Sequence, residues 1–121
     1  MSADLSNLTV GEFLHTLRQV VAEKGTNYVY PESDITDSGC RYRVDGRPSC
    51  LIGHALDRLG HVVPPELEAK SAAFVLDRLG VSQAAVGRVA DMAQLVQDEG
   101  HTWGEALETA EAAAAGWAVS A

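Results

Sequence analysis

The sequence predicts a mainly α fold with a small β-hairpin (α+β): a compact single domain of about five helices, with the hairpin inserted between helices 1 and 2. Three observations predict this class. Apolar residues recur at helical spacing in several segments that begin at capping residues and end at glycines. Another segment alternates around an Asp-Gly pair, which is typical of a hairpin. The 121 residues suit one domain over 1–121, with an ordered core over roughly 8–115 and frayed termini.

The first helix is predicted over residues 10–24. Thr9 and Glu12 have the spacing of a capping box, in which each side chain accepts the backbone N–H of the other residue. The apolar residues of one helical face follow: Val10, Phe13, Leu14, Leu17, Val20 and Val21. Gly25 ends the helix. Residues 28–30 have strand chemistry, which Pro31 terminates.

The hairpin is predicted between residues 40 and 50. Residues 40–44 alternate, Asp45-Gly46 fits a two-residue type I′ turn, and residues 47–50 return. This turn places Arg41 opposite Cys50 and therefore brings Cys40 close to Cys50. Successive side chains of a strand point to opposite faces, so we expect the arginines on one face of the ribbon and Cys40 on the other.

Helical segments fill the rest of the chain. The next helix covers residues 51–59, with Ser49 as its cap and Gly60 at its end. A helical stretch then runs from the Pro64-Pro65 pair to Gly80, in two pieces around Ser71.

Two more helices complete the prediction. Ser82 caps a longer helix that extends to about Val96, and Thr102 and Glu105 form a second capping box before the last helix. The chain from Gly116 onward is expected to fray.

The charge balance excludes several classes of function. Nine Lys and Arg stand against 17 Asp and Glu, which gives a net charge of -8. This charge disfavours nucleic acid and anionic membranes as partners. The chain opens on a polar segment and contains no apolar run of membrane-spanning length, so we expect a protein of a bacterial-type cytoplasm with reduced cysteines.

Four residues of two metal-ligating types gather around the hairpin and the helix that follows: Cys40, Cys50, His54 and His61. Thiolates and imidazoles contributed by a hairpin and a helix are ligands that zinc accepts, so zinc is a possible cofactor. The spacing lacks a Cys-x-x-Cys knuckle, which favours the alternative that the cysteines are small buried residues and that no cofactor is bound.

A thiol-dependent activity is the other chemical hypothesis for this region. Cys50 precedes a helix, whose dipole favours the thiolate, and His54 lies one turn further on as a base. No oxyanion hole accompanies the pair, so the sequence favours a protein that is not an enzyme and assigns no catalytic residue.

Candidate partner-binding residues are Arg41, Arg43, Arg47 and Trp103. The arginines form a basic cluster on the hairpin that can contact the phosphates or bases of a nucleic acid, or can lie solvated beside acidic loops. Trp103 can anchor an interface, although a core position is the alternative. Glu105, Glu108 and Glu111 line one edge of the last helix, which is usually a solvated face but also fits an acidic DNA mimic.

Residues 39–56, GCRYRVDGRPSCLIGHAL, and residues 97–106, QDEGHTWGEA, resemble a family of small uncharacterised proteins of actinobacteria and actinobacteriophages. The resemblance covers roughly residues 28–112 and implies a source without a catalytic residue or a mechanism. A short acidic phage protein without a recognisable active site is expected to bind a host or phage protein. The sequence therefore predicts a non-enzymatic interaction or regulatory module.

Overall fold

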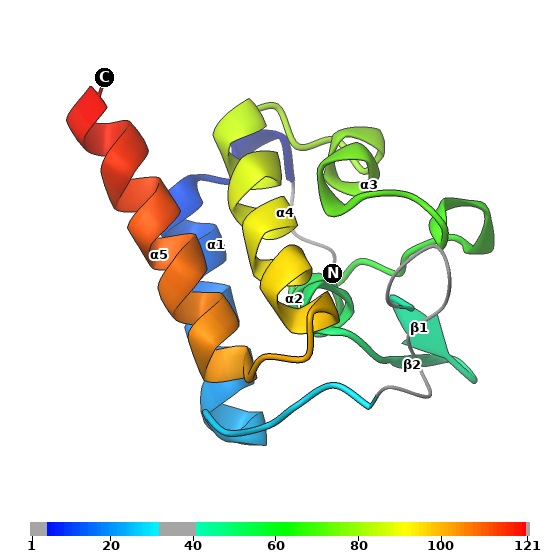
Figure 1. Ribbon diagram of the computed structural model, residues 1–121. Coiled ribbons are helices and arrows are strands. Elements are labelled where there is room, and N and C mark those ends of the chain that lie inside the picture. Colours follow the sequence, from blue (N-terminus) through cyan, green and yellow to red (C-terminus); the bar gives the residue numbers. More distant parts are fainter. Residues whose placement is uncertain (1–4, 32–40, 121) are drawn as a thin grey trace.

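The computed structural model describes residues 5–31 and 41–120 (Figure 1). In chain order the described elements are η1 (Leu5–Asn7), α1 (Val10–Lys24), β1 (Arg43–Val44), β2 (Arg47–Pro48), α2 (Leu51–Arg58), η3 (Pro65–Leu67), α3 (Ala72–Arg78), α4 (Ala84–Asp98) and α5 (Trp103–Ser120). The predicted class is confirmed: five α-helices and a two-stranded hairpin between α1 and α2 form these parts of the chain.

The start of α1 agrees with the predicted capping box. The Thr9 Oγ1 accepts the Glu12 N–H at 3.1 Å, and the Glu12 carboxylate accepts the Thr9 N–H at 3.0 Å. The core begins earlier than residue 8, since Leu5 in η1 is only 2% exposed. Leu5 packs into the apolar core together with Leu8, because the 3-10 turn before the cap points both side chains inward.

The hairpin has the predicted register. Arg43 pairs with Pro48 and Val44 with Arg47 in an antiparallel ladder. The Cys50 N–H donates to the Arg41 carbonyl at 3.0 Å, so those two residues lie opposite each other. Asp45 (φ 53°) and Gly46 (φ 77°) both have positive φ, as a type I′ turn requires.

Two predicted helix caps are wrong by one residue. Cys50, not Ser49, is the N-cap of α2, because the Ser49 N–H continues the hairpin to the Tyr42 carbonyl at 2.9 Å. Gln83, not Ser82, precedes α4, and the Ser82 hydroxyl donates instead to the Ser6 carbonyl at 2.6 Å. The predicted division around Ser71 is confirmed, since η3 precedes it and Ser71 caps α3.

The helices pack around one apolar core. In Figure 1, α4 lies beside α5, and the contacts place α3 against α4, α1 against α5 and α2 against both α1 and α4.

The strand predicted at residues 28–30 is reduced to a single β-bridge between Val29 and Thr102. The last helix continues beyond Gly116 to Ser120. In the described ranges, no helix is long and apolar enough to span a membrane.

Candidate functional site

The predicted metal ligands that lie within the described residues do not form a metal-binding group. Cys40 lies outside the described residues, while Cys50 is fully buried and its Sγ accepts the Gly53 N–H at 3.5 Å. Within residues 5–31 and 41–120, no three His, Cys, Asp or Glu side chains gather in a metal-binding group. For Cys50, the structure agrees with the burial hypothesis, and its sulfur is not accessible to a substrate in this conformation.

His54 lies against aromatic residues. Its ring meets the Trp103 ring edge-on, with centroids 5.5 Å apart, and Tyr28 contacts Trp103 in the same way at 4.6 Å. Burial lowers the pKa of His54, and the nearby positive charge of Lys24 lowers it further, against a smaller opposing effect of Asp57. Burial and the charge of Lys24 therefore both favour the neutral form of His54.

Trp103 is a core residue. Its side chain is fully buried, so the partner-contact role predicted for it does not apply in this conformation. Its Nε1 is the one buried side-chain polar atom in the described part of the chain without a hydrogen-bond partner. The backbone around it closes the N-terminal segment onto α5, because the Trp103 N–H donates to the Tyr28 carbonyl at 2.8 Å and the Gly104 N–H donates to the Thr26 carbonyl at 3.0 Å.

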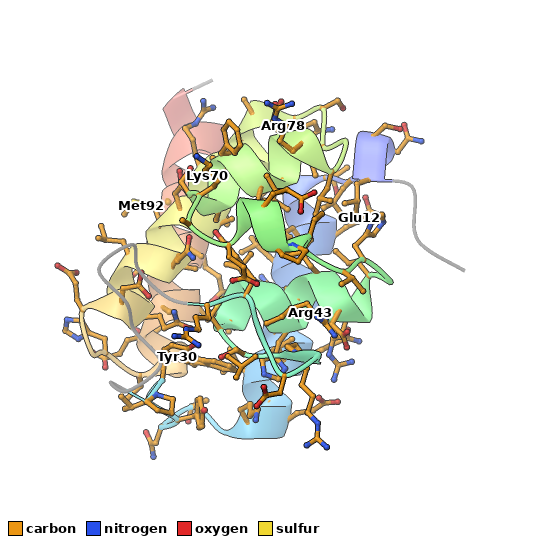
Figure 2. The ribbon with its side chains drawn as sticks, turned by 90° about the vertical axis from the view of Figure 1, so that its right-hand side faces the viewer. Glu12, Tyr30, Arg43, Lys70, Arg78 and Met92 are labelled. Carbon is orange, nitrogen blue, oxygen red and sulfur yellow. The ribbon has the colours of Figure 1, made fainter. Side chains whose placement is uncertain are left out.

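The three hairpin arginines separate in the structure. Arg43 pairs with Asp57 at 3.2 Å and also donates to the Gly46 carbonyl, so its guanidinium is engaged within the chain (Figure 2). The side chains of Arg41 and Arg47 are exposed. Of the three hairpin arginines, only these two are exposed and outside a described ion pair.

Two glutamates of the predicted acidic edge of α5 also form interactions within the chain. Glu105 closes the second capping box, where the hydrogen bonds from Thr102 lower the pKa of its carboxyl. Glu111 forms an ion pair with Arg18 at 2.7 Å.

A row of three polar side chains on α4 connects the helices, and sequence reasoning missed it. Asp91 accepts the Ala73 N–H at 2.9 Å, and Gln94 accepts the Ala72 N–H at 3.1 Å, at the start of α3. Gln97, which is fully buried, accepts the Leu51 N–H at 2.8 Å, at the start of α2. The only sequence signal is the three-residue spacing of these polar side chains, which places them on one side of a helix.

Glu68 attaches the hairpin to the helical body. Its two carboxylate oxygens accept the N–H groups of Tyr42 at 2.8 Å and Arg43 at 3.1 Å. The buried Tyr42 hydroxyl donates to the Lys70 carbonyl at 2.7 Å and accepts a hydrogen bond from the Gln94 amide at 3.2 Å. Much of the motif region therefore supports the fold, which leaves exposed residues elsewhere as candidates for function.

The most distinctive exposed feature is a ridge along α3, which we call the α3 ridge and define by Lys70, Phe74 and Arg78. Phe74 is 39% exposed. The Lys70 ammonium lies 5.8 Å and the Arg78 guanidinium 5.1 Å from the centroid of its ring, within the range of cation–π contact. Both cations are exposed, and neither has an ion-pair partner among the described residues.

The α3 ridge adjoins a shallow hollow on α4. Lys70, Ser71, Asp91, Met92, Gln94, Leu95 and Asp98 line the hollow. Met92 and Leu95 are 36% and 53% exposed. Figure 2 shows Lys70 and Arg78 on the same side of the molecule, with Met92 nearby. The sequence signal for the ridge is a Lys-x₃-Phe-x₃-Arg spacing, which aligns Phe74 and Arg78 on one face of α3, with Lys70 just before the N-cap Ser71.

Comparison with protein-family models, with curated proteins and with solved structures finds no match for this chain. The resemblance to actinobacterial and phage proteins accordingly stays a prediction. The fold and the exposed ridge define a small, mainly helical domain whose most distinctive surface combines an aromatic ring with two cations.

Proposed function

We propose that the protein is a non-enzymatic binding module that docks a host or phage protein onto the α3 ridge. The observation that carries the proposal is Phe74, a large aromatic side chain that is 39% exposed between two cations. Aromatic residues and arginine are enriched among the residues that dominate binding energy at protein interfaces. The ridge combines both.

The charges of the ridge indicate the chemistry of the partner. Lys70 and Arg78 are two cations at the surface of a chain whose net charge is -8, and the described acidic residues form no ion pair with them. A partner segment that places an apolar side chain on Phe74 and carboxylates beside the two cations satisfies all three groups at once. The partner is therefore a protein segment with acidic and apolar residues on one face.

Affinity capture from an actinobacterial lysate, with and without phage infection, tests the proposal. The wild-type chain, Phe74→Ser and the double variant Lys70→Glu/Arg78→Glu are immobilised, and captured proteins are quantified by mass spectrometry. We expect saturable capture of a partner by the wild-type chain and a loss of at least about tenfold in both variants, since a hot-spot side chain contributes about 2 kcal/mol or more.

Two matched controls make this capture specific. Val62→Ser removes an exposed apolar side chain outside the ridge, and Arg41→Glu/Arg47→Glu reverses two exposed charges on the hairpin. Both should keep wild-type capture. Equal capture by ridge variants and controls, or a loss confined to the hairpin variant, would show that the ridge is not the docking surface.

A further inference from the structure

The exposed side of α4 and its C-cap residue carry a stripe, which we call the α4 stripe and define by Arg88, Met92, Leu95 and the C-cap Glu99. All four side chains are exposed, with Met92 at 36% and Leu95 at 53%. Their spacing of four, three and four residues keeps them on one face of a helix. The opposite face of α4 is buried in the core through Val86, Val89, Ala90 and Ala93. Figure 2 shows Met92 near the outer edge of the molecule.

The stripe is symmetric in spacing and opposite in charge at its ends. Read from either end, it contains a charged residue, two apolar residues and a charged residue at the same intervals. Arg88 at one end is positive, and Glu99 at the other is negative. A second copy of α4 laid antiparallel along it places each Met92 against the Leu95 of the other copy. The same arrangement places each Arg88 beside the Glu99 of the other copy.

This pattern meets the requirement of a two-fold interface. In such an interface the same patch contacts itself, so a contact from residue i to residue j is repeated from j to i. The α4 stripe supplies one apolar pair and one ion pair, and the symmetry doubles both. The hollow beside Met92 and Leu95 gives the apolar side chains of the second copy a place to enter.

We propose that the α4 stripe is a self-association surface whose occupant is a second copy of this chain, antiparallel to the first. The inference goes beyond the proposed function because it assigns a different helix face to a different partner. Four exposed residues per copy make a contact well below the roughly 800 Å² per partner of a stable interface. The dimer is therefore reversible, with a dissociation constant between about 1 and 500 μM.

Sedimentation velocity over about 5–500 μM protein tests the inference. We expect the weight-average mass of the wild-type chain to rise from 12.8 kDa toward twice that value as the concentration increases. Leu95→Glu, which buries two carboxylates at the centre of the contact, should remain monomeric throughout. The matched control Val62→Glu adds the same charge at a 62% exposed position and should dimerise like the wild-type chain.

Charge reversal tests the antiparallel register. Arg88→Glu alone and Glu99→Arg alone each create two like-charge contacts and should weaken the dimer about tenfold. An equimolar mixture of the two variants should restore association, because every contact in the mixed dimer again joins opposite charges. The double variant Arg88→Glu/Glu99→Arg should also dimerise by itself, with both ion pairs inverted.

Three results would overturn the inference: a wild-type chain that is monomeric up to 500 μM, a dimer that Leu95→Glu leaves intact, or charge-reversal variants that the mixture fails to restore. The α4 stripe and the α3 ridge adjoin at the hollow, which Lys70 also lines, so each surface is tested by its own variant. The Leu95→Glu variant should lose the dimer and still capture the partner. The Phe74→Ser variant should lose capture and still form the dimer, and the two results together distinguish the two surfaces.

Discussion

Gln97 of α4 accepts a hydrogen bond from the backbone N–H of Leu51, 46 residues earlier in the chain, at 2.8 Å. Leu51 is the first residue of α2, and the first N–H groups of a helix have no partner within the helix. The Gln97 amide also donates to Asp98 at 2.9 Å, so both ends of a fully buried polar side chain are satisfied. A tertiary contact thus supplements the local cap at the start of α2, where the Cys50 Sγ accepts the Gly53 N–H.

Replacing Gln97 with methionine should destabilise the protein by about 1–3 kcal/mol, because a side chain of similar size leaves the buried Leu51 N–H without an acceptor. Chemical denaturation measures the free energy of unfolding. Gln83→Met is the matched control, since Gln83 is exposed and makes no side-chain capping bond. Equal stability of the two variants would show that the Gln97 bond does not stabilise α2.

Gly53→Ala should destabilise the protein by about 3 kcal/mol, because a Cβ at position 53 would lie 2.1 Å from the carbonyl oxygen of Tyr42. Tyr42 belongs to the chain leading into the hairpin, so relief of the clash requires moving the hairpin away from α2. Gly11→Ala in the first turn of α1 is the control, where the nearest atom would be 4.0 Å away. It should raise stability by roughly 0.5–1 kcal/mol, and a similar thermal shift in both variants contradicts the packing argument.

His54 makes stability depend on pH. Burial lowers its pKa in the folded state below the ordinary value of about 6.5, so the unfolded chain binds this proton more readily than the folded chain. The stability conferred by a neutral His54 is present above pH 6.5. It is lost as the pH falls from there through the lowered folded pKa, below which this contribution levels off.

Urea denaturation at a series of pH values from 5 to 8 measures this effect. The His54→Gln variant has no titratable side chain at this position. Its free energy of unfolding should therefore change less with pH between 6.5 and 5 than that of the wild-type chain. A wild-type slope that persists unchanged in His54→Gln would assign the pH dependence to other groups.

Glu68→Ala should loosen the hairpin without unfolding the helices. The substitution removes the acceptors for the backbone N–H groups of Tyr42 and Arg43, and amides that lose a partner exchange faster with solvent. Hydrogen exchange followed by NMR should show increased rates at those two amides and unchanged rates in α4. Glu66→Ala, which removes an exposed carboxylate two residues away, is the control. Uniform acceleration across the domain would contradict a local role for Glu68.

The sequence predicted local structure well because local chemistry determines it. The register predicted from the Asp45-Gly46 turn is confirmed, including the pairing of Arg41 with Cys50. Both predicted capping boxes are also present. The caps at Ser49 and Ser82 failed because tertiary contacts compete for the same groups. The Ser49 hydroxyl lies 2.6 Å from the Tyr30 hydroxyl, and its N–H belongs to the hairpin.

The candidate surfaces were harder to predict than the fold. Periodicity identifies which helical face is buried, but it does not show that Lys70 and Arg78 converge on one exposed ring, because this depends on side-chain geometry across the start of α3. The role of Gln97 was hidden for a similar reason: a buried amide at helical spacing shows nothing of the distant N–H that it serves. The predictions for Cys40 fall outside the described residues, so the zinc hypothesis stays a prediction.

The polar row on α4 constrains where the chain can change length. Inserting or deleting one residue between Asp91 and Gln97 turns part of the row by about 100° and directs it away from the N–H groups of α2 and α3. The segment between α2 and α3 has no such requirement on the rotational position of its side chains at Val62, which is 62% exposed. Length variation among related chains should therefore accumulate near Val62 and be absent from α4, where a single indel disconnects two helices at once.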